Sequence, residues 1–305
     1  MGTKTLAETI NETTRKHLTE GNGLLLGECI TAVGWVNNTV PNCKGIVELP
    51  MTDVAGAGIA VGAALVGRRP IFVVRFQDFL VLNGSPLIFF AAKTKTLHGN
   101  SAPVFVRAIG ADNAGPVHSG ILHRIFMHFP GFRVCAPMTP KEYKATWEDF
   151  MSHDDPMICS EHRISYKNAE EMPDVTVKNA DITLYAVSAP RFEAAKAARM
   201  LKADRIICNI VHVFRLKPLE LGPRLTRPLE QSAMGLVIDA GHEIAGASQS
   251  IAYELSQATG KSVKALGLLD RTKCECGPLL NSAPGAKNIY DTVIKMMGKR
   301  HRRKA

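Results

Sequence analysis

The first half of the chain alternates short apolar runs with longer segments of helical length. Most of the runs are apolar throughout rather than at every second position, which is typical of strands buried on both faces of a parallel sheet. The predicted strands are 23–30, 45–50, 69–76, 102–109, 132–137 and 157–162, and the predicted helices between them are 53–66, 80–97, 118–129 and 139–152. This succession predicts right-handed crossovers and an α/β fold built on a mostly parallel sheet.

The helix predicted at 139–152 has the clearest start. Thr139 stands at the N-cap, Pro140 at the first helical position, and Glu142 where a capping box closes. The amide groups in the first turn of a helix have no partners within the helix. The side chains of Thr139 and Glu142 can accept hydrogen bonds from such amides, and Pro140 has no amide hydrogen to satisfy.

Residues 163–180 interrupt the pattern with charged residues, Pro and Asn, and a second series of strands and helices follows. Its predicted strands are 181–188, 205–213, 235–241 and 262–269, and its predicted helices are 190–202, 242–259 and 288–298. The sequence therefore predicts two α/β domains with mostly parallel sheets, at residues 1–170 and 181–305, joined by a linker at 171–180.

Gly56, Gly58 and Gly62 lie in "ELPMTDVAGAGIAVGAALVG" (48–67), close to the glycine fingerprint of dinucleotide-binding loops. That fingerprint places its glycines in the turn directly after a strand, with an acid about 20 residues later. Here the glycines come inside the predicted helix, with one residue too many between them, and no acid follows until Asp78. We therefore favour close packing of another backbone against this helix over nucleotide binding.

Asp53 stands in front of the same helix and has two interpretations. Aspartate is a good N-cap residue, so its role can be purely structural. Functional sites of parallel sheets, however, gather beyond the carboxyl ends of the strands. Other candidates lie near or just after the ends of predicted strands: Glu28 closes the first, Phe76 and Phe79 stand at and after the end of the third, and His118 follows the fourth. An acid, an aromatic ring and a histidine are therefore expected to converge at one rim of the sheet.

The composition is that of an ordinary globular protein. Of the 305 residues, 46% are hydrophobic and 21% are charged, which is enough for a full core. No apolar run approaches the roughly 18 residues that suggest a membrane helix. The first 20 residues carry three glutamates and lack the apolar core of a secretion signal. We expect a cytoplasmic protein without a membrane segment.

Two further features leave alternatives open. Cys274 and Cys276 are the one close pair among seven scattered cysteines, and no second pair of ligands lies near them at zinc-finger spacing, so buried or loop thiols are favoured over a metal site. The terminal segment "GKRHRRKA" (298–305) contributes much of the net charge of +9. It is interpreted as a solvated chain end rather than a nucleic-acid-binding segment, because no aromatic residues interleave its charges.

Several segments resemble, in order and spacing, the beta chain of thiamine-diphosphate-dependent 2-oxoacid dehydrogenases, a family related to transketolase. They are "LLLGECI", "TDVAGAGIAVGAALVGRRPI", "FFAAKT", "GPVHSG", "HFPGFRVCAP" and "PMICSEH". The resemblance runs from about residue 23 to 166 and continues more loosely through "DITLYAVSAP" and "IDAGHEIAGASQSIAYEL". It implies a transketolase-like pyrimidine-binding domain followed by a transketolase C-terminal-type domain.

The resemblance also implies roles for individual residues. Asp53 stands where the family has a glutamate that hydrogen-bonds the pyrimidine ring nitrogen of thiamine diphosphate and so activates the cofactor. Phe79 matches the aromatic residue that stacks on the pyrimidine, and Met51 matches a backbone position that lines it. His118 matches a histidine on the substrate side, and Glu28 matches an acid linked to the neighbouring active centre.

Two positions depart from the family pattern. Asp53 is one methylene shorter than glutamate, about 1.5 Å, and a displacement of about 1 Å at a reacting group can cost on the order of 100-fold in rate. A shifted helix, a bridging water and a crippled activation are the outcomes left open. In "FMSHDDP", His153 and Asp155 replace an acid and an amide of the family's potassium loop, which leaves potassium binding open as well.

The family resemblance implies that a "GDG" segment followed by asparagines holds the diphosphate through magnesium, and this chain has no "GDG". An alpha-type partner chain is therefore expected to carry the magnesium and the diphosphate, in an α2β2 heterotetramer. The implied activity is cleavage of a 2-oxoacid or ketose with transfer of the acyl or two-carbon fragment. A split transketolase-like or carboligase subunit and a catalytically silent assembly partner are the alternatives.

Overall fold

The computed structural model of the chain describes residues 4–298 apart from 22, 32–33, 35 and 275–279. The chain divides into two compact units, residues 1–171 with 214–218 and residues 172–213 with 219–305, each with its own sheet. None of the described helices is long and apolar enough to cross a membrane. Cys276 and the basic tail from residue 299 lie outside the described residues.

The sheet of the first unit has the strand order β2-β1-β3-β4-β6-β5-β9. Its strands are β1 (Leu24–Glu28), β2 (Ile46–Leu49), β3 (Pro70–Val74), β4 (Phe105–Gly110), β5 (Arg133–Cys135), β6 (Met157–His162) and β9 (Arg215–Lys217). All pairs are parallel except β5 with β9. The predicted α/β fold is confirmed, and β3, β4 and β6 are buried along their whole length, as their continuous apolar runs predict.

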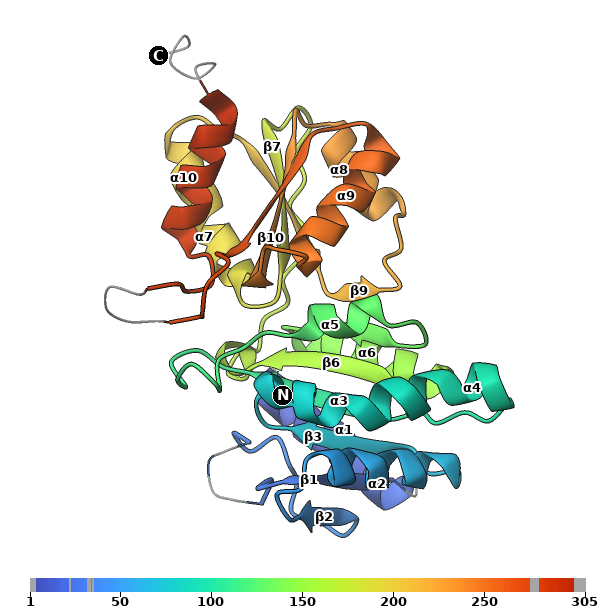
Figure 1. The fold of residues 1–305 in the computed structure, drawn as a ribbon. Helices are drawn as coiled ribbons and strands as arrows, with labels where there is room; N and C mark the ends of the chain where they lie inside the picture. Colours follow the sequence, from blue (N-terminus) through green and yellow to red (C-terminus); the bar gives the residue numbers. More distant parts are fainter. Residues whose placement is uncertain (1–3, 22, 32–33, 35, 275–279, 299–305) are drawn as a thin grey trace. The chain divides into compact units, whose positions relative to one another are not determined.

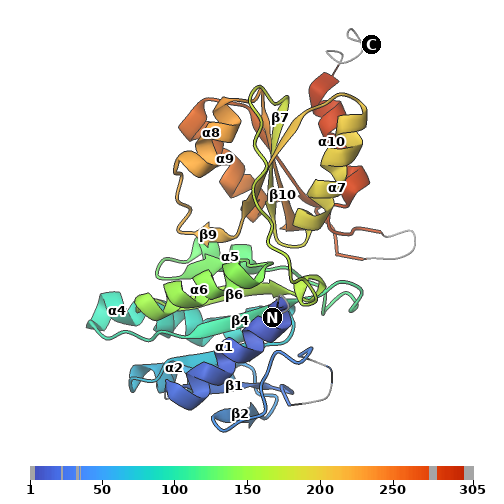
Figure 2. The ribbon, with the colours of Figure 1, turned by 180° about the vertical axis from the view of Figure 1, so that it is seen from behind.

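Helices cover both faces of this sheet, as the two opposite views in Figures 1 and 2 show. On one face, α1 (Leu6–Glu20) packs beside α6 (Pro140–Ser152), and residues of both helices join the strands in one apolar core. The other face carries α2 (Val54–Leu65), α3 (Leu80–Pro86) and α4 (Ala92–His98). The helices therefore enclose a sheet whose carboxyl-terminal strand ends carry the loops.

The helix predicted at 80–97 contains a wide turn. α3 leads through the π-helical segment η2 (Leu87–Ala91) into α4 without a break. Pro86 stands directly before this wide turn. A proline removes one helical amide donor and crowds the preceding turn, which accounts for the local widening.

The helix predicted at 118–129 forms only in part, as α5 (His123–His128). The amides of Gly120 and Leu122 donate to the side chains of Asp78 and Gln77, both at 2.8 Å, instead of starting a helix. His118 consequently stays in the loop that follows β4.

The start of α6 follows the prediction with one shift. Thr139 Oγ1 accepts a hydrogen bond from the amide of Glu142 (3.3 Å), and Pro140 is the first helical residue. The Glu142 carboxylate, however, accepts from the amide of Met138 (3.0 Å), one residue before the N-cap. Both side chains still satisfy amide groups at the helix start.

The second unit has a parallel four-stranded sheet in the order β11-β10-β7-β8. Its strands are β7 (Ile182–Val187), β8 (Cys208–Val213), β10 (Gly235–His242) and β11 (Val263–Leu268), and its helices are α7 (Pro190–Ala203), α8 (Pro223–Glu230), α9 (Ala247–Thr259) and α10 (Ala286–Met297). α7 packs with α10, and α8 packs with α9. Only α8 was not predicted from the sequence, because its eight residues are too few for a clear helical period.

A fully buried ion pair links β4 to β6 in the first unit. Arg107 donates to both carboxylate oxygens of Glu161, from Nε at 2.6 Å and from Nη2 at 2.8 Å. The hydroxyl of Tyr166 donates to the same carboxylate at 2.6 Å. The pair is therefore satisfied on both sides, as a buried charge must be.

Arg107→Met is expected to lower the free energy of unfolding by about 3–5 kcal/mol, because it leaves the Glu161 carboxylate buried without its counter-charge. Lys4→Met is the matched control, since the Lys4–Glu12 pair is exposed and its loss should leave stability unchanged. Urea unfolding of the three proteins measures both effects. Equal stability of Arg107→Met and the wild type would contradict this account of the core.

Candidate active site

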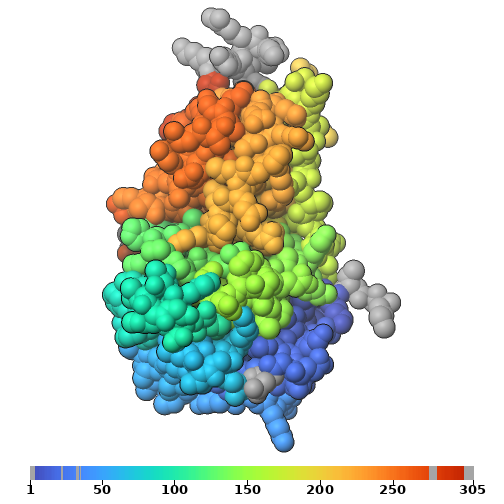
Figure 3. All heavy atoms as spheres, turned by 90° about the vertical axis from the view of Figure 1, so that its right-hand side faces the viewer, coloured from blue at the N-terminus to red at the C-terminus, as the bar shows by residue number. Residues whose placement is uncertain are grey.

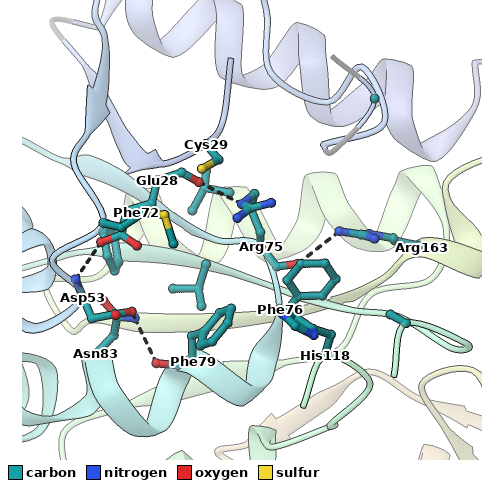
Figure 4. A pocket seen from close by; sticks show the side chains of 15 residues that line it. Glu28, Cys29, Asp53, Phe72, Arg75, Phe76, Phe79, Asn83, His118 and Arg163 are labelled. Atoms are coloured by element: carbon teal, nitrogen blue, oxygen red, sulfur yellow. Dashed lines mark hydrogen bonds between the residues drawn. The ribbon is translucent and has the colours of Figure 1, made fainter. Parts of the chain in front are cut away.

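The first unit contains a pocket of about 560 Å³ at the carboxyl-terminal ends of its strands (Figure 4). The five residues selected from the sequence, Glu28, Met51, Asp53, Phe79 and His118, all line it. They come from the ends of β1 and β2 and from the loops after β3 and β4. The expected convergence at one rim of the sheet is therefore present in the structure.

Glu28 fixes the turn that leads into α2. Its Oε1 accepts hydrogen bonds from two successive amides, those of Thr52 (2.8 Å) and Asp53 (2.6 Å). Asp53 adopts a φ of 39°, a left-handed conformation that a residue with a Cβ rarely takes. Such strain persists where the surroundings impose it, and here the Glu28 carboxylate holds the strained amide in place.

The Asp53 side chain does not cap α2. It makes no hydrogen bond to the first turn of the helix, so the interpretation of Asp53 as an N-cap is wrong. Instead, Asp53 Oδ1 accepts from Nδ2 of Asn83 on α3, at 3.2 Å. The strained turn therefore directs the carboxylate to the pocket lining.

Asn83 is a pocket residue that sequence reasoning missed. It is 3% exposed, and its Nδ2 also donates to the carbonyl of Phe79 at 2.9 Å. Its Oδ1 is buried and has no hydrogen-bond partner among the described residues, at a cost of about 1–3 kcal/mol. Its polar side chain directly after the apolar run "FLVL" (79–82) is the sequence signal that could have indicated it.

Three rings form the aromatic wall of the pocket. The imidazole of His118 lies edge-on to Phe76, with 4.6 Å between ring centroids, and edge-on to Phe79, with 5.5 Å. The two phenylalanine rings are 6.3 Å apart. Met51 stands at the rim, where its side chain is 75% exposed. A flat apolar surface thus lies beside a carboxylate and a histidine.

Two arginines complete the lining and were also missed. Arg75 Nε donates to the carbonyl of Glu28 (2.9 Å), and Arg163 donates to the carbonyl of Arg75 (3.3 Å). Both guanidinium groups lie over the ring of Phe76, at 5.6 and 4.5 Å from its centroid. Burial lowers the pKa of both arginines, and the charge of Arg75 further lowers that of Arg163. Both follow strand ends, so the rule that selected Phe76 could have found them.

The pocket residues fit one part of thiamine diphosphate, its pyrimidine ring. A flat heteroaromatic ring needs an apolar wall, which Phe79 offers. The nitrogen atoms at the edge of the ring need hydrogen-bond partners, and the pocket offers the Asp53 carboxylate and the unpartnered Oδ1 of Asn83. Oxygen ligands for magnesium are a separate requirement. Within the described ranges, no three His, Cys, Asp or Glu residues gather as a metal site would require.

The segment that resembles the potassium loop is occupied by ion pairs. Arg69 pairs with Asp154 at 2.6 Å, and Lys95 pairs with Asp155 at 3.2 Å. The His153 ring hydrogen-bonds the carbonyl of Asp149 at 2.9 Å. Basic side chains therefore already neutralise the two acids of this loop.

Residues 36–168, which include most of this pocket, match the family model described as the pyrimidine-binding domain of transketolase. This segment is a transketolase-type pyrimidine-binding domain. The match includes Met51, Asp53, Phe79 and His118, while Glu28 lies just before it.

Curated relatives extend the similarity beyond this domain. The chain is 28% identical over 235 residues to the beta subunit of acetoin:2,6-dichlorophenolindophenol oxidoreductase of Cupriavidus necator, covering 72% of this chain and 69% of that protein. It is 26% identical over 224 residues to the pyruvate dehydrogenase E1 component subunit beta of Rickettsia felis, covering 68% of each. It is 29% identical over 191 residues to the 2-oxoisovalerate dehydrogenase subunit beta of Bacillus subtilis, covering 57% and 58%. The chain is thus a homologue of such beta subunits.

Solved structures agree on the fold. A structure titled "Split gene transketolase, inactive beta4 tetramer" has a TM-score of 0.74 at 17% identity and covers 96% of this chain and 98% of its own. The transketolase of Campylobacter jejuni has a TM-score of 0.71 at 16% identity, with 94% of this chain matched to 44% of that one. Both establish a transketolase-like fold.

The strain at Asp53 predicts an unusual order of stability among substitutions. Asp53→Gly is expected to unfold with a free energy about 1 kcal/mol higher than Asp53→Ala, because only glycine adopts a positive φ without steric cost. At Ala63, inside α2, the order should be the ordinary one, with Ala63→Gly less stable than the wild type by about 1 kcal/mol. Denaturant titration compares the four proteins. An Asp53→Ala protein more stable than Asp53→Gly would show that this turn is unstrained.

Proposed function

We propose that this chain is the beta-type subunit of a two-chain thiamine-diphosphate enzyme that cleaves a 2-oxoacid or ketose and transfers the acyl or two-carbon fragment. The observation that carries the proposal is the single pocket, in a domain of the pyrimidine-binding type, that unites Asp53, Phe79, His118 and Glu28. An alpha-type partner would supply the diphosphate and magnesium site, in an α2β2 heterotetramer.

Each pocket residue has a chemical task in this proposal. Thiamine diphosphate supplies the nucleophile and the electron sink for cleavage next to a carbonyl group. Asp53 would hydrogen-bond the pyrimidine ring nitrogen of the bound cofactor, and Phe79 and the backbone at Met51 would line its ring. His118 faces the substrate and moves a proton or binds its carboxylate. Glu28 holds the two amides that orient Asp53.

An exposed apolar face next to the pocket supports the need for a partner. Large apolar side chains of α2, α3, η2 and α4 are between 45% and 65% exposed: Ile59, Leu65, Val81, Leu82, Phe89, Phe90 and Leu97. The segments that carry α2 and α4, light blue and teal, lie beside each other on the surface in Figure 3. Gly58 and Gly62 on α2 have open space where a Cβ would stand. Large apolar side chains exposed in such number on neighbouring helices are typical of an interface.

Activity of the reconstituted pair tests the function. The chain is produced with its alpha-type partner, supplied with thiamine diphosphate and magnesium, and assayed for dye reduction with 2-oxoacids and for carbon–carbon bond formation between a donor and an aldehyde. We expect the first reaction, with each chain inactive alone and with the pair inactivated by Asp53→Ala. Carbon–carbon bond formation alone would favour the carboligase alternative. Full activity of Asp53→Ala would refute the role of this carboxylate and support a silent partner.

The open glycine on α2 predicts a specific assembly defect. Gly62→Leu is expected to leave the isolated chain folded, with a melting temperature at or above that of the wild type, because the position is exposed and leucine favours the helix. The leucine would prevent close packing of the partner, so co-purification with the alpha-type chain should be lost. Gly62→Ala is the matched control and should still assemble. Normal assembly of Gly62→Leu would place the interface elsewhere.

A further inference from the structure

We propose that Asn83 is a positioning residue for the Asp53 carboxylate, an inference that rests on the function proposed above. Asn83 stands one turn after Phe79, so the same short segment carries the aromatic wall and the amide that contacts Asp53. Both residues line the pocket, and Figure 4 shows the Asn83 amide between the Asp53 carboxylate and the Phe79 carbonyl.

The contacts of Asn83 define which way its amide group faces. Nδ2 donates to Asp53 Oδ1 at 3.2 Å and to the Phe79 carbonyl at 2.9 Å. Both partners are acceptors, so the NH2 group, and not the oxygen, must point to them. A flipped amide would set an oxygen against two oxygens. The donor side of Asn83 is therefore committed to the carboxylate and to its own backbone.

The hydrogen bond from Asn83 restricts the orientation of the Asp53 carboxylate. Within the described residues, Asn83 donates the one hydrogen bond that the Asp53 carboxylate receives. Oδ1 is thereby engaged, and Oδ2 remains for a donor at the edge of a bound ring. A short aspartate reaches less far than a glutamate, so its angle must be well defined for the remaining oxygen to meet the ring nitrogen.

The carbonyl oxygen of the Asn83 side chain also supports a role in positioning. Its Oδ1 is buried without a hydrogen-bond partner among the described residues, although the residue is 3% exposed. A purely structural asparagine would have both halves of its amide satisfied. Asn168 of the same unit shows that arrangement: its Nδ2 donates to two backbone carbonyls and its Oδ1 accepts from an amide. The unpaired Oδ1 of Asn83 is explained if the residue serves to position the Asp53 carboxylate and to contact a bound ring.

The experiment uses the complex of this chain with its alpha-type partner and magnesium. Asn83→Ala and Asn83→Asp both remove the donor, and Asn83→Asp keeps the side-chain shape. Asn168→Ala is the matched control, because it removes similar hydrogen bonds outside the pocket. The measurements are the melting temperature of the isolated chain, the dissociation constant of thiamine diphosphate, kcat and KM of the complex, and the rate at which the thiazolium C2 proton exchanges with deuterium when no substrate is present.

We expect both Asn83 variants to slow the proton exchange and kcat by on the order of 10- to 100-fold, with KM and the dissociation constant of the cofactor little changed. The melting temperature should stay close to that of the wild type in Asn83→Ala but fall in Asn83→Asp, which sets a buried carboxylate oxygen against two oxygens. Asn168→Ala should exchange at the wild-type rate. In an Asp53→Ala background, Asn83→Ala should have no further effect on exchange, because Asn83 acts through the carboxylate.

Three results would overturn the inference, and they are distinguishable. Wild-type exchange rates in both Asn83 variants would show that Asp53 needs no such support. A full additional loss in the Asp53→Ala background would show that Asn83 acts on the ring independently of the carboxylate. If the wild-type complex neither binds the cofactor nor exchanges the proton, the proposed function itself is wrong, and the role of Asn83 falls with it.

Discussion

The site depends on one interaction: the Glu28 carboxylate at the end of β1 accepts hydrogen bonds from the amides of Thr52 and Asp53 at the start of α2. This interaction imposes a positive φ on Asp53, which would otherwise be free to take the ordinary conformation of a helix cap. Because the turn is strained, the aspartate side chain leaves the helix end and reaches Asn83. The contact between β1 and the start of α2 thereby determines where the Asp53 carboxylate lies in the pocket.

The same helices carry the pocket and the exposed apolar face. Asp53 directly precedes α2, and this helix presents Gly58 and Gly62 to open space. α3 carries Asn83 on its buried side and Val81 and Leu82 on its exposed side. A chain that packs on this face would contact the two helices that position the carboxylate. Assembly and the geometry of the proposed site are therefore physically linked in the first unit.

Much of the fold could be predicted because its signals are local. Buried parallel strands are continuously apolar, and the rule that sites gather at strand ends brought Glu28, Asp53, Phe79 and His118 to one pocket. The short strand β9 is different, since its three residues have no period and pair with β5 only in the folded unit. The helix predicted around His118 does not form there. The amides of this loop donate to Asp78 and Gln77, which belong to another segment, so the local sequence carries no signal of these hydrogen bonds.

The role of Asp53 as a pocket residue rather than a cap could not be decided from the sequence, because both interpretations use the same residue at the same place. A crystal structure of the chain with its alpha-type partner and thiamine diphosphate is the most direct test. The account predicts a carboxylate oxygen of Asp53 within hydrogen-bond distance of the pyrimidine ring nitrogen, with Phe79 against the ring. A ring bound elsewhere, or an Asp53 side chain turned onto the first amides of α2, would contradict it.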